Sequence, residues 1–330
     1  MPNLRLSLAC GDYDRTRALK DGRVSPEGID LTYIPLEAEE IFWRMLQYTE
    51  FDVSEMSLSN YLTERSKEKP RFIAIPIFPS RIFRHSFIFI NKKAGIKVPE
   101  DLKGKKMGLP EYSMTALVWI RGTLEHDYGV APSDVEWYVG GQEQPGREER
   151  IEIKLPENVH LHPIPREKTL NEMLANGEID ALIAARVPSC FWKKSPDVDR
   201  LWPDYKEVEM EYFERTKIFP IMHTVVIKQE IYNTYPWVAQ SLCKAFCQAK
   251  KFAQENINSS VALTCMLPWT ITEYDLTTSL MGEDFWPYGV EANRITLEAM
   301  TQYSYEQSLS SHKFSVEELF ASNTYKEFKV

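Results

Sequence analysis

The chain has 330 residues, and its 43% of hydrophobic and 12% of aromatic side chains are enough to fill one large core or two smaller ones. Only 14 residues are Gly and no segment is of low complexity, which excludes a largely disordered chain. The net charge of -9, from 39 Lys and Arg against 48 Asp and Glu, gives no basic field for a polyphosphate. We therefore expect no nucleic-acid partner.

The N-terminus has the pattern of a strand and not of a targeting segment. Leu4, Leu6 and Leu8 alternate with polar residues, whereas a signal peptide needs a continuous apolar stretch. No run approaches the roughly 18 apolar residues of a membrane span, so we expect no membrane partner. The five cysteines are odd in number and widely scattered, which is typical of reduced thiols. Together these features predict a cytoplasmic protein.

Short β-type runs alternate with helical patterns over the first two thirds of the chain, which predicts an α/β fold with mostly parallel sheets. The first series has strands over 4–10, 29–35, 51–56 and 72–78, and helices over 38–48 and 58–67. The second has strands over 86–91, 105–109, 135–139 and 179–185, and helices over 113–128 and 169–176. From Tyr235 onward the pattern is almost purely helical, with Pro236 at a helix start.

An internal repeat predicts two similar lobes. Met45-Leu46, Glu50, Phe51 and Asp52 recur 128 residues later as Met173-Leu174, Glu178, Ile179 and Asp180. A chance recurrence of helix, acidic turn and strand is the alternative. We expect lobe 1 to comprise residues 1–84 and 222–330 and lobe 2 residues 90–216, with crossings near 85–89 and 217–221. The ligand would then bind in a cleft between the lobes.

Arginines gather on the loops where ligands of open parallel sheets bind, after the ends of the strands. Five arginines on such loops of an acidic protein suggest an anionic ligand, because the guanidinium fork holds carboxylates in two-point contact. They are Arg15, Arg17, Arg81, Arg84 and Arg186. For Arg15, Arg17 and Arg84, surface pairs with nearby carboxylates are the alternative. Arg81 and Arg186 have no acidic residue within three positions.

Other loop residues are candidates for catalysis and binding. His85 and His223 fall on the expected crossings, where a group that titrates near neutral pH would meet the ligand, although each would also suit a packing role. Ser113 and Thr115 open a helix whose first amides would bind a carboxylate, unless they only cap the helix. Tyr112 and Ser57 lie in equivalent loops. There is no phosphate loop, GxSxG elbow or HExxH motif, which argues against nucleotide cofactors and acyl-enzyme chemistry.

These segments together resemble the 4,5-dihydroxyphthalate decarboxylase family, within the type II periplasmic-binding-protein-like superfamily. The resemblance runs over most of the chain and is densest over 8–16, 51–59, 73–86, 110–116 and 179–186. It implies a two-lobed α/β fold with two parallel-rich sheets flanked by helices. It also implies removal of one carboxylate from 4,5-dihydroxyphthalate, or a related hydroxylated aromatic acid, to give protocatechuate in phthalate degradation, with no organic cofactor.

Such a reaction needs a proton donor, because direct loss of CO2 from an aryl ring would leave an unstabilised carbanion. It also needs a partner for the phenol and cations for two carboxylates. The residues expected in these roles are His85 or His223 as the donor, Asp12 or Glu55 at the phenol, and Arg81, Arg84 and Arg186 as clamps. Further substrate contacts are expected from Arg15, Ser57, Tyr112, Ser113 and Thr115. If both histidines fail, Glu111, Glu55 or a bound water is the next donor to consider.

Several alternatives stay open at this point. A divalent metal held by His85, His223 and Glu55 would do similar work on a catechol, but the spacing of these residues has no ligand signature. The rival function is a non-enzymatic solute-binding protein for an aromatic carboxylate or another small anion, against which the missing signal peptide argues. Pyrimidine-forming and menaquinone-pathway enzymes share the scaffold and are a third alternative. The sequence does not decide between a monomer and a homo-oligomer.

Overall fold

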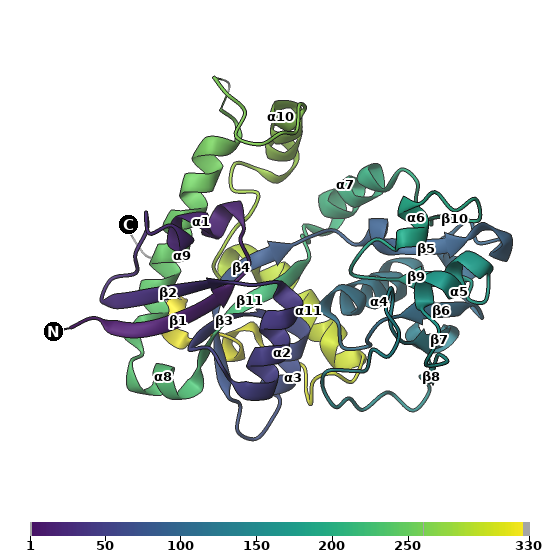
Figure 1. The fold of residues 1–330 in the computed structure, drawn as a ribbon, viewed down its shortest axis with the longest axis horizontal. Helices are drawn as coiled ribbons and strands as arrows, with labels where there is room; N and C mark the ends of the chain where they lie inside the picture. The colour runs from purple at the N-terminus through teal and green to yellow at the C-terminus, as the bar shows by residue number, and fades with distance from the viewer. Residues whose placement is uncertain (1, 260, 326–330) are drawn as a thin grey trace. The chain divides into compact units, whose positions relative to one another are not determined.

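The computed structural model describes residues 2–259 and 261–325, and contacts between Cα atoms divide the chain into two compact units (Figure 1). Unit 1 comprises the chain up to Arg81, His223–Leu297 and the residues from Phe314. Unit 2 comprises Ile82–Met222 and Glu298–Lys313. Each unit contains a β-sheet of its own.

The sheet of unit 1 has the strand order β2-β1-β3-β11-β4. Its strands are β1 (Leu4–Cys10), β2 (Ile29–Pro35), β3 (Val53–Ser57), β4 (Phe72–Arg81) and β11 (Ile221–Lys228). Strand β1 runs parallel to β2 and β3, whereas β11 is antiparallel to β3. The helices are α1 (Asp14–Lys20), α2 (Ala38–Tyr48), α3 (Leu58–Arg65), α8 (Gln229–Thr234), α9 (Trp237–Ile257), α10 (Thr270–Met281) and the start of α11 (Arg294–Glu306).

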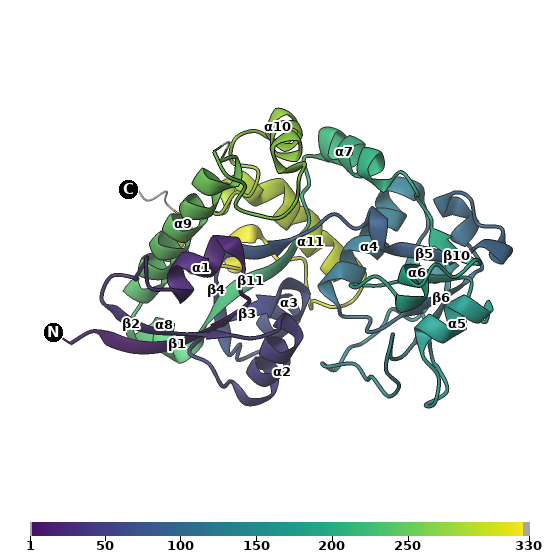
Figure 2. The same ribbon diagram turned by 45° about the horizontal axis from the view of Figure 1, so that its top comes forward.

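Helices cover both faces of this sheet. Figures 1 and 2 show α1 and α9 on one face and α2 and α3 on the other. The apolar stripe of α9 is fully buried against alternate residues of the strands, as its helical spacing predicts. The stripe consists of Val238, Leu242, Ala245, Phe246 and Ala249. Because successive strand residues point to opposite faces, Leu6, Leu8 and Cys10 join this core together.

The sheet of unit 2 has the strand order β10-β5-β9-β6-β7-β8. Its strands are β5 (Ile88–Asn91), β6 (Lys106–Leu109), β7 (Glu136–Val139), β8 (Leu161–Pro163), β9 (Ala181–Ile183) and β10 (Val198–Arg200). Strands β9, β6, β7 and β8 are parallel neighbours, whereas β5 is antiparallel to both β9 and β10. The helices are α4 (Thr115–Tyr128), α5 (Leu170–Asn176), α6 (Ser189–Trp192) and α7 (Tyr205–Thr216), with a 3-10 turn at His85–Phe87.

The two copies of the sequence repeat have the same local structure. Helix α2 is followed by Thr49 and helix α5 by Gly177 as C-cap residues, both with left-handed backbone, and each turn leads into a buried strand. An aspartate precedes each strand and accepts a main-chain N–H of the parallel neighbour. Asp52 Oδ2 accepts from Ser7 and Asp180 Oδ2 from Lys106, both at 2.9 Å. The acidic residue of the repeat therefore joins adjacent strands.

The C-terminal third of the chain differs from the expectation that 222–330 stay together, because 298–313 group with unit 2. Two buried side chains explain the difference. The ring of Tyr303 lies directly on Gly122 of α4, and Gln307 hydrogen-bonds Arg121 of the same helix. These contacts tie the end of α11 to α4.

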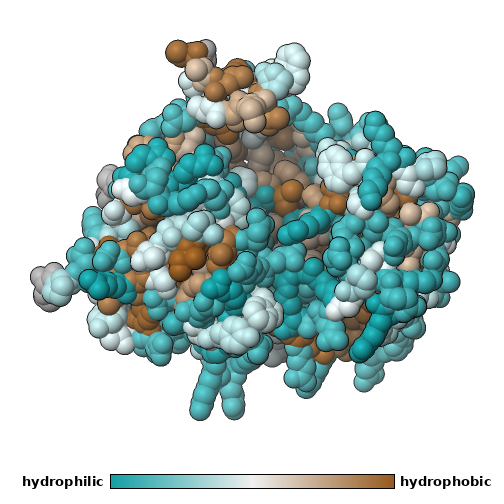
Figure 3. Space-filling model, viewed as in Figure 1, coloured by the Kyte–Doolittle hydropathy of each residue, from teal (hydrophilic) through white to brown (hydrophobic). Residues whose placement is uncertain are grey.

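No described helix is long and apolar enough to cross a membrane. The segment between α9 and α10 nevertheless exposes several large apolar side chains, which include Val261, Met266 and Trp269. Figure 3 shows apolar residues at the projecting tip near α10.

Candidate active site

In unit 1 the carboxylate of Glu55 is completely buried and holds four hydrogen-bonding groups. His223 Nδ1 lies 2.5 Å from Oε1, and the hydroxyl of Tyr13 donates to the same oxygen at 2.8 Å. Oε2 accepts the main-chain N–H of Gly11 at 2.9 Å and lies 3.5 Å from the thiol of Cys10. A buried carboxylate is tolerated only when it is satisfied in this way.

The strand register brings Glu55 and His223 together. In the antiparallel pair of β3 and β11, His223 lies opposite Ser57 and Glu55 lies opposite Val225. Side chains two residues apart on a strand point to the same face, so Glu55 and His223 are diagonal neighbours on one face. The Phe42 ring of α2 packs edge-on against the imidazole, with ring centroids 4.8 Å apart. The sheet and helix α2 therefore hold the histidine from two sides.

Burial and charge set the protonation states of this cluster. Burial would raise the pKa of Glu55, but the facing His223 and the hydrogen bonds from Gly11 and Tyr13 outweigh it and hold the pKa below its usual value. Glu55 is therefore ionised near neutral pH. Burial and the Glu55 charge both raise the pKa values of Tyr13 and Cys10, so these two groups stay protonated as donors.

A stack of side chains adjoins this cluster. The guanidinium of Arg15 packs on the rings of both Tyr13 and Trp286, 4.4 Å and 4.3 Å from their centroids. Arg15 Nε also donates to the carbonyl of Pro79 at 2.6 Å. A cavity of about 640 Å3 in unit 1 is lined by Asp14 and Phe285, the sequence neighbours of this stack. The guanidinium of Arg15 pairs with Asp14 at 3.0 Å, so this cation is bound to a residue of the cavity wall.

The other predicted residues of unit 1 have different surroundings. Asp12 is exposed and pairs with Lys20 at 2.5 Å, and this hydrogen bond lowers its pKa. Ser57 is the N-cap of α3, where its side chain accepts the N–H of Asn60. Arg81 is buried, stacks on Phe78 and donates to Pro287 and Asn293. Burial lowers the pKa of Arg81 to about 9.

In unit 2, Arg84 and His85 are both buried. Arg84 contacts Met222 Sδ at 3.1 Å and the carbonyl of Ala185 at 3.3 Å, and burial lowers its pKa to about 9. His85 packs against the rings of Tyr212 and Trp202, with centroids 4.9 Å and 5.2 Å away. Neither of its ring nitrogens hydrogen-bonds a described residue, and burial lowers its pKa to about 4. His85 is therefore a neutral histidine in an aromatic environment.

The predicted carboxylate site before α4 holds a carboxylate of the chain itself. The main-chain N–H groups of Tyr112 and Ser113 donate to the two oxygens of Glu149, at 2.7 Å and 2.9 Å. Helix α4 begins at Thr115, after Met114 at the N-cap position. Arg186 is exposed at the end of β9, and its carbonyl accepts the side-chain amide of Gln142.

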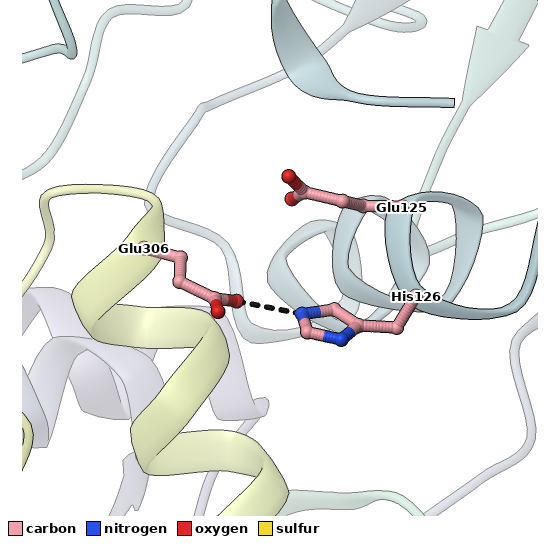
Figure 4. Close-up of side chains that lie close together, drawn as sticks. All are labelled: Glu125, His126 and Glu306. Carbon is pink, nitrogen blue, oxygen red and sulfur yellow. Dashed lines mark hydrogen bonds and ion pairs between the residues drawn. The ribbon is translucent and has the colours of Figure 1, made fainter. Parts of the chain in front are cut away.

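One group of described residues has the geometry of metal ligands: Glu125, His126 and Glu306, whose candidate atoms lie within 4.8 Å of one another. Figure 4 shows the ion pair of 2.7 Å between His126 of α4 and Glu306 of α11, with Glu125 beside it. None of the three was expected as a ligand, since the metal alternative named His85, His223 and Glu55. Of those, Glu55 and His223 are in contact in unit 1, whereas His85 belongs to unit 2.

Sequence reasoning missed Tyr13, Gly11 and Trp286 as members of the site. Tyr13 and Gly11 lie in a loop that was predicted to be important, but nothing in their identities pointed to Glu55. A Cβ at Gly11 would lie 2.6 Å from the Tyr13 hydroxyl, so only glycine lets the ring fold back toward the carboxylate. That requirement appears only in three dimensions.

No family model matches the chain. A 4,5-dihydroxyphthalate decarboxylase of Comamonas testosteroni is 40% identical over 330 residues, which is 100% of this chain and 100% of that protein. A protein of the same name from Pseudomonas putida is 44% identical over 213 residues, which is 64% of this chain and 83% of that protein.

Two solved structures show the fold. The periplasmic sulfonate-binding protein SsuA from Methylobacillus flagellatus KT has a TM-score of 0.54 at 14% identity and covers 97% of this chain and 92% of its own. A mutant of the desulfurization enzyme DSZB, in complex with biphenyl-2-sulfinic acid, has a TM-score of 0.52 at 13% identity and covers 97% of each chain. The predicted fold class, the two-lobed type II periplasmic-binding-protein-like fold, is confirmed. With 40% identity over its full length to a decarboxylase, the chain belongs to the 4,5-dihydroxyphthalate decarboxylase family of carboxy-lyases.

Proposed function

We propose that this chain removes one carboxylate from 4,5-dihydroxyphthalate, or from a closely related hydroxylated aromatic acid, and releases protocatechuate and CO2. The name of its relatives supplies the substrate. The observation that carries the chemistry is the contact of 2.5 Å between His223 and the ionised, buried Glu55. This contact presents an oriented histidine, which is the group that a ring protonation needs.

The reaction begins with transfer of a proton to the ring carbon that bears the leaving carboxylate. The hydroxyl para to that carbon supplies the electron pair for the new C–H bond and passes its own proton to solvent water. The C–C bond to the carboxylate then breaks, and its electrons restore the aromatic ring as CO2 leaves. The phenol oxygen finally takes back a proton, so one proton is consumed and one CO2 is released in each turnover.

In this scheme His223 is the proton donor and Glu55 is the residue that positions it. The Nδ1–H group donates to Glu55, so Nε2 is the nitrogen that exchanges protons with the ring. The Glu55 carboxylate fixes the orientation of the imidazole ring through this contact. Both oxygens of Glu55 already accept hydrogen bonds from Gly11, Tyr13 and His223. We therefore assign the phenol to another partner.

The arginines divide into two groups in this proposal. Arg81 and Arg84 donate to groups of their own units from buried positions, so we assign them to holding the chain in place. Arg15 and Arg186 are better placed to bind a carboxylate, since Arg15 pairs with Asp14 of a cavity wall and Arg186 is exposed. A clamp is most useful on the carboxylate that stays, because tight binding of the leaving group would stabilise the ground state as well.

We further propose a cytoplasmic site of action. All five cysteines are free of disulfide bonds, and the Cys10 thiol lies against Glu55. Reduced thiols in this position are typical of proteins that work in a reducing compartment.

The direct test is to incubate the purified chain with 4,5-dihydroxyphthalate and to measure CO2 and protocatechuate. Phthalate, which lacks the hydroxyl groups, is the control and should not react. Binding of 4,5-dihydroxyphthalate without any release of CO2 would contradict the proposal and favour a solute-binding protein.

The assignment of the donor predicts the effect of His223→Asn. We expect turnover to fall by about 10² to 10⁴-fold, while the affinity for phthalate stays close to that of the parent, because a general acid contributes in the transition state. His160→Asn, at an exposed position, is the matched control and should turn over like the parent. A loss of less than tenfold in His223→Asn would rule out this donor.

A further inference from the structure

We propose that unit 2 contains a carboxylate-binding site made of the N–H groups of Tyr112 and Ser113 and backed by Arg121. Glu149 of the same chain occupies this site, and a carboxylate of the ligand displaces it. The choice of an aromatic dicarboxylate as the ligand rests on the proposed function, whereas the site itself rests on geometry and charge.

The site has the geometry of two-point carboxylate recognition. Tyr112 N–H donates to Oε2 of Glu149 at 2.7 Å, and Ser113 N–H donates to Oε1 at 2.9 Å. Each oxygen thus receives one main-chain donor, as in the anion-binding turns of other proteins. The turn leads into α4, a helix of 14 residues, whose dipole adds positive potential at this end.

A buried cation lies next to these amides and is the second observation. Arg121 of α4 is only 1% exposed, and its Cζ lies 3.8 Å from the centroid of the Tyr112 ring. It donates to the carbonyl of Tyr112 at 2.6 Å and to Gln307 at 2.9 Å. Its third nitrogen, NH1, has no hydrogen-bond partner among the described residues.

Arg121 makes the site require an anion. Within the described part of the chain no carboxylate forms a close ion pair with it, and Glu149 is the carboxylate whose charge acts on it. A buried charge without compensation is costly. If Glu149 leaves, another carboxylate at the same two amides restores the compensation. Backbone donors, a buried cation and an exchangeable carboxylate together define a site for a carboxylate ligand.

The segment that carries Glu149 is built to stay close to the site. It lies between β7 and β8, where residues 140–160 form no helix or strand. Arg147 and Arg150 pair with the buried carboxylate of Glu111, at 2.5 Å and 3.3 Å. These pairs hold Glu149 opposite the amides, so it competes with a ligand at a high effective concentration. Glu149 itself is partly exposed, which lets its side chain exchange without unfolding of the unit.

The decisive experiment measures ligand affinity after the internal competitor is weakened. Glu149→Gln removes the charge and replaces one acceptor oxygen with a donor. If the site is open about a tenth of the time in the parent, the affinity for phthalate should rise about tenfold in this variant. Titration calorimetry with phthalate measures the effect, and this ligand is used because it carries both carboxylates but does not react.

Two controls distinguish a carboxylate-binding site from a segment that only blocks access. Glu148→Gln changes the same residue type at the neighbouring exposed position and should bind phthalate like the parent. Catechol has the ring hydroxyls but no carboxylate, so Glu149→Gln should leave its affinity unchanged. Equal phthalate affinity in Glu149→Gln and the parent would overturn the proposal. An equal gain for catechol and phthalate would also overturn it, because the segment would then only block access.

The outcome is independent of the test of the proposed function. A tenfold gain in phthalate affinity with no turnover of 4,5-dihydroxyphthalate by the parent would support the site and refute the decarboxylation. Turnover by the parent with no change in phthalate affinity would support the decarboxylation and refute the site.

Discussion

At the residue scale, the two candidate histidines differ in what surrounds them. Sequence alone does not distinguish them, because both lie near expected crossings and neither has an informative neighbour in sequence. His223 contacts Glu55, which lies 168 positions away and reaches it through strand pairing. His85 is surrounded by aromatic rings instead. Residue type and position along the chain therefore identify candidates, but the partner that orients His223 comes from strand pairing.

The buried neutral state of His85 predicts a pH-dependent stability. Its pKa is about 4 in the folded chain and about 6.5 when exposed, so below pH 6.5 the unfolded state binds a proton that the folded state does not. The free energy of unfolding should therefore decrease as the pH falls. Between pH 7 and pH 5 this histidine should account for a loss of about 2 kcal/mol.

His85→Phe removes the titrating group and keeps an aromatic ring beside Trp202 and Tyr212. Urea unfolding at pH 7 and pH 5 should show a loss of stability that is about 2 kcal/mol smaller in the variant than in the parent. Identical losses in the two proteins would mean that His85 already titrates normally in the folded state.

At the element scale, apolar periodicity identified most of the strands and the long helices, but it did not predict β10 or β11, and it missed helices where burial is slight. Helix α9 has a clear stripe and was expected, whereas α7 has a single buried residue, Tyr212, and was missed. Helix α1 was missed because seven residues of mixed charge after a Gly-Asp loop give too short a pattern. Strand β9 is shorter than expected, although the residues that follow it remain apolar. Short or solvent-facing elements are stabilised by packing that one sequence does not display.

The contact between α4 and α11 predicts an unusual effect of a glycine substitution. In the middle of a helix, Gly→Ala normally stabilises by about 0.5 to 1 kcal/mol. At Gly122 the added Cβ would collide with the buried ring of Tyr303, so we expect Gly122→Ala to destabilise by about 1 to 3 kcal/mol. Chemical denaturation of Gly122→Ala in the parent and in a Tyr303→Leu background measures the effect. If the loss is as large without the Tyr303 ring, the collision is not its cause.

At the scale of the whole molecule, the sequence predicts the fold class and the family. It predicts less well which distant segments of the chain pack together. The fold class and the family follow from motifs spread over the chain, and both are confirmed by the comparisons. The other lobe limits stay a prediction. Residues 298–313 group with unit 2 and not with unit 1, because the end of α11 packs on α4. The Glu149 contact was not foreseen, since a charged residue in an irregular segment gives no signal of where its side chain binds.

The position of residues 298–313 yields the last prediction, on the cooperativity of unit 2. Gln307 is 1% exposed, accepts from Arg121 Nε at 2.9 Å and donates to the carbonyl of Val118 at 3.0 Å. Gln307→Ala leaves both groups of α4 buried without these partners, which should cost about 2 to 4 kcal/mol. Because the loss falls on α4, hydrogen exchange should speed up over residues 115–128, far away in sequence, and stay unchanged in β1 and β3 of unit 1. Gln302→Ala changes a half-buried glutamine that bonds Glu306 on the same helix, and it should leave α4 protected. Faster exchange in β1 and β3 with α4 unaffected would show that this segment belongs energetically to unit 1.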